Sequence, residues 1–167
     1  MTAPHLLTGN GLTVDRIRDL IRSDSPIGLD SGAQERIAAS RSVVDRLQAG
    51  ERSYYGINTG FGALAHTHIP AADIEKLQEN LILSHAVGVG AEVDPAIVRL
   101  MLLLKVNALA IGLSGVRPVL VEYLIRFHNA GLAPVVYAKG SLGASGDLAP
   151  LAHLTLALLG LGEVWAE

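Results

Sequence analysis

Apolar residues recur every three or four positions along most of this chain, a pattern that predicts amphipathic helices. Start and stop signals such as Asp94-Pro95 and Asn129-Ala130-Gly131 bound the segments that carry it. We expect six helices, over residues 13–25, 30–50, 70–88, 94–112, 117–131 and 148–159. The segment 94–112 is apolar on nearly all sides, so its helix is expected to be central and buried. Strand patterning is confined to 133–137.

Two stretches rich in glycine interrupt the helical pattern. Residues 52–70 hold Gly56, Gly60 and Gly62 within seven positions, too many glycines for a central strand and too few periodic apolar residues for a helix. Residues 140–146 are mostly small and lead directly into the last helical segment. The sequence therefore predicts a mainly α fold, a helical bundle with two glycine-rich loops, in a single domain over 1–167 without internal repeats.

Composition narrows the class of protein. The chain has 167 residues, of which 50% are hydrophobic and 17% charged, which excludes a disordered chain and supplies ample apolar surface for a core. The formal net charge is −3 and the chain has no basic run, so we expect no nucleic-acid partner. The absence of cysteine excludes disulfides and thiolate metal sites.

The apolar segment 97–113 does not predict a membrane span, because Arg99 and Lys105 interrupt it. The N-terminus lacks the basic and long apolar regions of a signal peptide, so we expect a cytoplasmic protein. The mean hydropathy of +0.38 is nonetheless high for such a chain. It indicates apolar surface that another chain, or sequence beyond this one, covers.

The loop 140–146 ends at a helix N-terminus, where free backbone N–H groups favour negative charge. It is not a phosphate-binding P-loop, because it lacks the lysine and Ser/Thr pair that follow the last glycine of that motif. Taken alone, the loop is better explained as a tight turn capped by Asp147. His66 and His68 could chelate a metal, but the sequence offers no further ligand cluster, so no metal site is expected.

Two longer motifs point to a specific family. GSLGASGDLAPLAH, over 140–153, and YYGINTGFG, over 54–62, resemble the signature motifs of the aromatic amino acid ammonia-lyases, in the order expected for that family. Within the family the resemblance is to the histidine-specific members, and it covers essentially the whole chain. It implies the N-terminal portion of the ammonia-lyase fold, because family members are much longer chains that work as homotetramers.

The resemblance implies a cofactor made from the chain itself, the methylidene-imidazolone (MIO) of Ala144-Ser145-Gly146. In the family, the amide nitrogen of the residue matching Gly146 attacks the carbonyl of the residue matching Ala144, and the serine, here Ser145, is dehydrated. Glycine suits the attack because a Cβ would block the strained approach. The product is an electrophile that no ordinary side chain offers, and the resemblance implies neither an external cofactor nor a metal.

Tyr55 matches the family's catalytic base, which removes the β-proton of the substrate, whereas its neighbour Tyr54 does not match. An unperturbed tyrosine has a pKa of about 10, so Tyr55 would need positive potential nearby to act near neutral pH. The glycines of the loop would let it close over the substrate. The alternative is that Tyr55 is an aromatic packing anchor of its loop.

The pair Ser84-His85 matches the position at which histidine-specific members carry Ser-His. His85 shares a helical stripe with Leu77 and Leu81, which predicts that it points inward, where it could bind the imidazole of a bound histidine. The alternative is a core histidine whose hydrogen bonds the protein itself satisfies.

The resemblance thus implies conversion of L-histidine to urocanate and ammonia by a non-oxidative elimination. Two alternatives remain open: a tyrosine or phenylalanine ammonia-lyase or aminomutase, and a non-catalytic helical oligomerisation module. The family also draws active-site residues from later in the chain and from neighbouring subunits, and these have no counterpart in this sequence. We therefore expect the isolated chain to be inactive.

Overall fold

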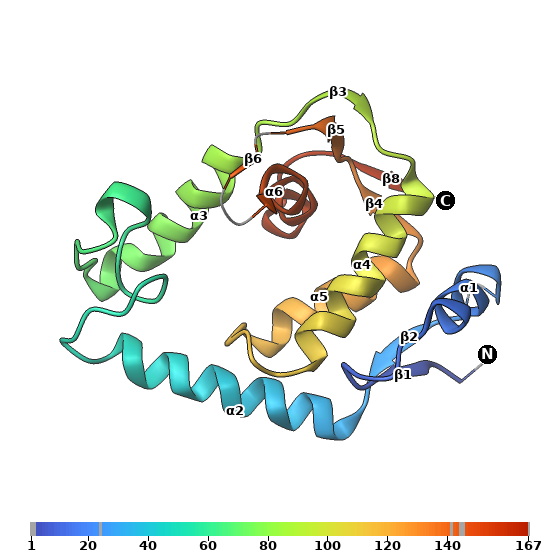
Figure 1. Ribbon diagram of the computed structural model, residues 1–167, viewed down its shortest axis with the longest axis horizontal. Coiled ribbons are helices and arrows are strands. Elements are labelled where there is room, and N and C mark those ends of the chain that lie inside the picture. Colours follow the sequence, from blue (N-terminus) through green and yellow to red (C-terminus); the bar gives the residue numbers. More distant parts are fainter. Residues whose placement is uncertain (1–2, 24, 141, 144–145, 167) are drawn as a thin grey trace.

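The structure is a computed structural model that describes residues 3–23, 25–140, 142–143 and 146–166. Within these residues the chain forms six α-helices (Figure 1). They are α1 (Val14–Ser23), α2 (Ser31–Gln48), α3 (Ile74–His85), α4 (Pro95–Ala110), α5 (Pro118–Asn129) and α6 (Ala149–Leu156). Each predicted helical segment contains one of them, so the prediction of a mainly helical fold is confirmed.

Aspartate side chains cap the starts of two helices, one of which, Asp94, is predicted from the sequence. The Asp30 carboxylate accepts a hydrogen bond from the Gly32 backbone N–H at 2.9 Å, at the start of α2. Asp94 accepts one from the Ala96 N–H at 2.8 Å, and Pro95 is the first residue of α4. These carboxylates satisfy N–H groups that the geometry of a helix start leaves without a partner.

Two helices end earlier than the sequence predicts. Helix α3 ends at His85 and not at Gly88. Helix α6 ends at Leu156 and continues as the 3-10 turn η3 (Ala157–Leu159). Two further 3-10 turns, η1 (Gly62–Leu64) and η2 (Ala71–Asp73), lie between α2 and α3.

Short strands form four pairs among the described residues. The strands are β1 (His5–Leu7), β2 (Ile27–Leu29), β3 (Val89–Glu92), β4 (Leu132–Pro134), β5 (Tyr137–Lys139), β6 (Leu142–Gly143), β7 (Gly146–Asp147) and β8 (Val164–Ala166). β1 pairs with β2 in parallel, whereas β3 with β5, β4 with β8 and β6 with β7 are antiparallel. The expectation that strand structure is confined to 133–137 is therefore wrong. Strands of two to four residues are too short for alternation to reveal them.

The core lies where α4 and α5 pack together and against β4. On the inner face of α4, Leu102 and Val106 are completely buried. Its other face is open, because Ile97, Leu104 and Ile111, spaced seven residues apart, are 53%, 42% and 40% exposed. Helix α4 is thus central, as predicted, but buried on one face only. The open face contributes to the high mean hydropathy.

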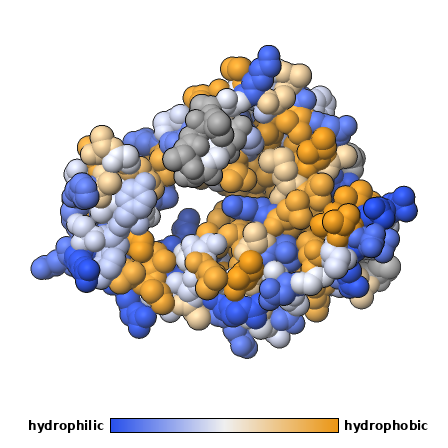
Figure 2. Space-filling view, in the orientation of Figure 1, coloured by the Kyte–Doolittle hydropathy of each residue, from blue (hydrophilic) through white to orange (hydrophobic). Residues whose placement is uncertain are grey.

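The two glycine-rich loops lie around a hollow in the molecule. Helix α3 runs from the side of the segment 52–70 toward β6, while α2 passes along the opposite edge (Figure 1). Figure 2 shows a hollow between the side of the molecule formed by α3 and the segment 52–70 and the side formed by α4, α5 and α6. No helix in the described part of the chain is long and apolar enough to cross a membrane.

Candidate active site

The segment 52–70 folds back on itself. Thr59 forms a β-bridge with His68, and the Ile69 backbone N–H donates to the Asn58 carbonyl oxygen at 2.9 Å. The Gly60 N–H donates to the Thr67 carbonyl at 3.1 Å. The predicted loop is therefore present, and its own backbone hydrogen bonds hold its two arms together.

Two buried polar side chains shape the turn that carries Tyr55. Asn58 is 0% exposed; its Oδ1 accepts from the Tyr54 N–H at 2.7 Å and its Nδ2 donates to the Arg52 carbonyl at 3.0 Å. Thr59, 1% exposed, accepts from the Gly56 N–H through Oγ1 at 3.3 Å. Neither residue was predicted to have a role. Their residue types indicate one, because Asn and Thr side chains in turns commonly form hydrogen bonds to nearby backbone groups.

Tyr55 lies on the outside of this turn. It is 66% exposed, and its ring meets that of Phe61 edge-on, with the centroids 5.7 Å apart. Gly56, which follows it, has a φ of +75°, a conformation that favours glycine. Contact with one ring of its own loop makes Tyr55 a weak packing anchor, and most of its surface stays accessible.

The second glycine-rich loop contains a tight hairpin. β6 and β7 pair Leu142 with Asp147 and Gly143 with Gly146. Ala144 and Ser145, two of the three residues expected to form the cofactor, lie outside the described residues. Gly146 has a φ of +104°, and no described atom lies within 4 Å of the place that a Cβ would occupy. Glycine is required at this position by the backbone conformation, and not by crowding from the described atoms.

His85 is the last residue of α3 and is half-buried, as are Leu77 and Leu81, which agrees with the predicted stripe. Its Nδ1 lies 2.7 Å from the Leu81 carbonyl oxygen and 3.1 Å from Ser84 Oγ. Since a carbonyl oxygen only accepts, Nδ1 carries the proton, and Nε2 of the neutral ring is an acceptor. The ring is thus held at one nitrogen by its own helix, and the other nitrogen remains able to accept a hydrogen bond.

His153 connects the His85 end of α3 with the helix that follows the hairpin. It is 8% exposed, and its Nε2 accepts a hydrogen bond from the Gly88 N–H at 2.8 Å. Burial lowers the pKa of His153 below its ordinary value. Gly88 lies three residues after His85, and His153 lies seven residues after Gly146. His153 was not predicted to have a role, because the sequence around a single histidine in a helix does not indicate its hydrogen-bond partner.

The predicted site residues therefore fall into two groups. The structure brings the end of α3, with His85, close to the segment that contains Gly146, because α3 packs against α6. The loop with Tyr55 lies toward the other end of α3, across the hollow (Figures 1 and 2). A helix of the length of α3 spans about 18 Å, so the loop that contains Tyr55 and the end of α3 that contains His85 lie apart.

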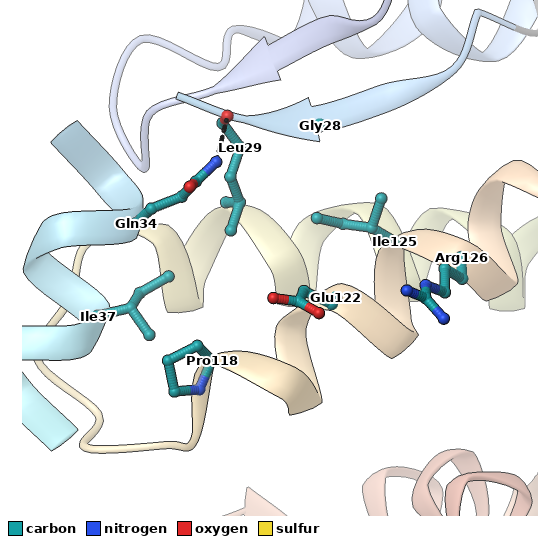
Figure 3. A pocket seen from close by; sticks show the side chains of 8 residues that line it. All are labelled: Gly28, Leu29, Gln34, Ile37, Pro118, Glu122, Ile125 and Arg126. Carbon is teal, nitrogen blue, oxygen red and sulfur yellow. Dashed lines mark hydrogen bonds between the residues drawn. The ribbon is translucent and has the colours of Figure 1, made fainter. Parts of the chain in front are cut away.

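A separate cavity of about 340 Å³ lies between β2, α2 and α5 (Figure 3). Its lining residues are Gly28, Leu29, Gln34, Ile37, Pro118, Glu122, Ile125 and Arg126. Gln34 donates a hydrogen bond to the Leu29 carbonyl at its edge, at 3.3 Å. Of the predicted site residues that the structure describes, none lines this cavity.

Metal-ligating side chains do not gather at either loop. Across the described residues, no group of three or more His, Asp or Glu side chains is placed to hold a metal ion. The predicted site residues offer a phenol, an imidazole and a glycine-rich hairpin, a set suited to proton transfer and hydrogen bonding.

Known proteins resemble this chain in sequence and in fold. The family model of aromatic amino acid lyase matches residues 12–167. Histidine ammonia-lyase of Rhodospirillum rubrum is 52% identical over 164 residues, which are 98% of this chain and 32% of that protein. The crystal structure of histidine ammonia-lyase from Trypanosoma cruzi matches with a TM-score of 0.88 and 38% identity, over 98% of this chain and 32% of that one. Tyrosine aminomutase from Streptomyces globisporus matches with a TM-score of 0.89 and 30% identity, over 99% of this chain and 31% of that one.

This chain spans about a third of the length of each of these relatives. The match to the family nevertheless runs from residue 12 to the last residue and includes both glycine-rich loops. The chain therefore belongs to the aromatic amino acid lyase family.

Proposed function

We propose that this chain is the N-terminal portion, a single domain over 1–167, of a histidine ammonia-lyase that converts L-histidine to urocanate and ammonia. The observation that carries the proposal is the state of His85. Its Nδ1 is held by the Leu81 carbonyl, which leaves Nε2 as an acceptor for the ring N–H of a substrate imidazole. The 52% identity to a histidine ammonia-lyase supports the same substrate.

We infer that Ala144, Ser145 and Gly146 form the MIO cofactor. The fit rests on Gly146, whose φ of +104° is rare in residues with a side chain, and on the pairing of Gly143 with Gly146 in a tight hairpin. The cofactor supplies an electrophile that takes up the substrate amino group and makes it a leaving group. The chain's own part is to present the Gly146 amide nitrogen at the hairpin and to place His85 beside it through α6.

Tyr55 is the proposed base for the β-proton. Its position on the outside of a turn braced by Asn58 and Thr59 leaves most of the side chain accessible to a ligand. A base must come within hydrogen-bond reach of the proton that it removes, so the loop has to approach the hairpin when substrate binds.

The fold does not separate this proposal from the alternatives, because an aminomutase shares it at a TM-score of 0.89. His85 favours an imidazole or phenol ring over a phenyl ring, since an imidazole N–H and a phenol O–H can both donate to Nε2 of neutral His85 and a phenyl ring offers no donor. The 52% identity to a histidine ammonia-lyase favours the imidazole over the phenol. Assembly of the whole enzyme as a homotetramer in the cytoplasm is part of the proposal. The open apolar face of α4 is the surface in this chain that such an assembly would cover.

The test uses the intact enzyme that contains this chain. Its mass is expected to fall short of the sequence mass by two waters, and it is expected to release urocanate and ammonia from L-histidine. Ser145→Ala has no hydroxyl to eliminate, so this variant is the control and should release neither product. An intact enzyme with its full sequence mass and no activity on L-histidine would contradict the proposal and favour the non-catalytic module.

A further inference from the structure

His153 is a buried titratable side chain that the proposed reaction does not use. Its Nε2 accepts the Gly88 backbone N–H at 2.8 Å, and its ring meets Tyr137 edge-on with centroids 5.1 Å apart. The imidazole therefore joins α6 to the segment after α3 and to β5. These elements contact one another and lie together in Figure 1.

The partner of His153 fixes its protonation. A backbone N–H can only donate, so Nε2 must offer its lone pair and Nδ1 must carry the ring proton. A protonated ring would turn one N–H toward another and lose the bond. Burial of the ring lowers its pKa and so favours the neutral form that the contact needs.

The same contact explains why residue 88 is glycine. A Cβ at Gly88 would lie 2.9 Å from His153 Nε2 and 3.1 Å from Tyr137 Cβ, closer than real Cβ contacts allow without movement of a neighbour. The sequence predicts that the helix extends to Gly88, but α3 ends at His85. Gly88 therefore serves close approach of the backbone to the imidazole.

We propose that His153 is a positioning residue, whose neutral Nε2 holds the segment 86–88 against α6 and thereby sets the place of His85 relative to the Gly146 hairpin. The contact itself stands on the geometry, and its effect on catalysis rests on the proposed function. His85 is three residues from the held amide, and α6 begins three residues after Gly146. A shift at His153 is thus passed to both parts of the site along short lengths of chain.

The elements packed against α6 bring few charges near this ring. They are α3, β4, β5 and η3, and their titratable side chains are Glu75, Lys76, Glu79, His85, Tyr137 and Lys139. The pKa of His153 is lowered by desolvation, and no charged neighbour contributes to that shift. Acid is therefore expected to break the contact by protonating His153 itself.

Three variants separate positioning from bulk packing. His153→Gln keeps an acceptor but cannot titrate in this range, whereas His153→Leu keeps apolar volume and leaves the Gly88 N–H without a partner. Gly88→Ala leaves the acceptor unchanged and displaces the segment by crowding. His128→Gln, on α5, is the matched control for loss of a histidine.

The first measurement is hydrogen exchange of the Gly88 amide in the intact enzyme, resolved by mass spectrometry. Exchange should rise about tenfold in His153→Leu, stay near the wild-type rate in His153→Gln and be unchanged in His128→Gln. In the wild type, the protection of the Gly88 amide, taken relative to its intrinsic exchange rate at each pH, should also fall in acid, and His153→Gln should remove this fall. This pH comparison still tests the proposal if His153→Leu does not fold. If the protection of the Gly88 amide changes neither in His153→Leu nor in acid, the proposal is overturned.

The second measurement is steady-state kinetics with L-histidine. His153→Leu and Gly88→Ala should lower kcat/KM about tenfold, mainly by raising KM. His153→Gln should keep kcat/KM near the wild-type value and shift the acid limb of the pH profile to lower pH. Equal losses in His153→Gln and His153→Leu would overturn the positioning role. If the wild type has no activity on L-histidine, the proposed function fails while the exchange result still decides whether His153 holds Gly88.

Discussion

Asn58 Oδ1 accepts a hydrogen bond from the backbone N–H of Tyr54 at 2.7 Å, and the Asn58 side chain is completely buried. This bond closes the turn that places Tyr55 on the outside of its loop. The second bond of Asn58, from Nδ2 to the Arg52 carbonyl, ties the same turn to the segment that enters the loop. The orientation of the proposed base therefore depends on a neighbouring amide side chain.

Asn58→Ala should loosen this turn. The substitution leaves the Tyr54 N–H and the Arg52 carbonyl without their partner, at a cost of about 2 kcal/mol in local stability. Limited proteolysis of the segment 52–60 should become faster and kcat of the intact enzyme should fall. Asn80→Ala, at an exposed position of α3, is the control. Unchanged proteolysis and kcat in Asn58→Ala would show that the bond does not hold the turn.

Tyr55→Phe should abolish proton removal without disturbing the fold. The variant retains the ring that meets Phe61 and loses only the hydroxyl. Since general-base catalysis is worth about 10²–10⁴-fold, kcat should fall by that factor while the melting temperature stays constant. Tyr54→Phe is the matched control one residue away and should retain activity. A larger loss in Tyr54→Phe than in Tyr55→Phe would reassign the base.

The sequence predicted the helices and both glycine-rich loops because their signals are local. Asp94 acts as the expected cap, since a capping carboxylate binds an N–H two residues away. The strand pairs were missed because each residue of β1 finds its partner more than twenty positions away, as His5 does with Ile27. A strand of three residues carries no periodicity that would reveal such a partner.

The candidate site divides in the same way. The resemblance named Tyr55, His85 and Gly146, and the structure adds the residues that hold them. The sequence could not show that His85 Nδ1 is satisfied by Leu81, nor that His153 meets Gly88 across 65 positions. The contact between His153 and Gly88 depends on the packing of α3 against α6, which no local pattern encodes.

His85→Leu should change the substrate that the intact enzyme prefers. Leucine has no acceptor to replace Nε2, so the ring N–H of an imidazole in the site would be left unpaired, whereas a phenyl ring has no donor to leave unpaired. We expect kcat/KM for L-histidine to fall at least about tenfold relative to that for L-phenylalanine. Competition assays with mixed substrates measure this ratio directly. A ratio that stays the same in His85→Leu would remove His85 from substrate recognition.

His153 should make the stability of the protein depend on pH. Its folded-state pKa lies below the ordinary value of 6.5, so just below pH 6.5 the unfolded chain binds more protons than the folded one. The stabilisation from the neutral ring is therefore present above pH 6.5 and is lost as the pH falls below it. In urea unfolding, the free energy of unfolding of the wild type should fall relative to that of His153→Gln as the pH is lowered from 7.

The pH comparison between these two proteins isolates His153, because His5, whose pKa is also lowered by burial and by Arg16, is present in both. A constant difference in the free energy of unfolding between wild type and His153→Gln at all pH values would mean that His153 has the same pKa in both states.

The two faces of α4 should respond differently to truncation. Leu102 is completely buried, whereas Leu104, two residues later, is 42% exposed on the open apolar face. Leu102→Ala should lower the free energy of unfolding by about 2–5 kcal/mol, because it removes packed methyl groups and leaves a cavity. Leu104→Ala removes the same atoms from a half-solvated surface, so its direct effect on the fold should stay below about 1 kcal/mol. If the open face is covered in the assembled enzyme, Leu104→Ala should instead weaken assembly, seen as a concentration-dependent loss of oligomer in analytical ultracentrifugation. An assembly that tolerates Leu104→Glu as well would mean that this face of α4 is not part of the interface.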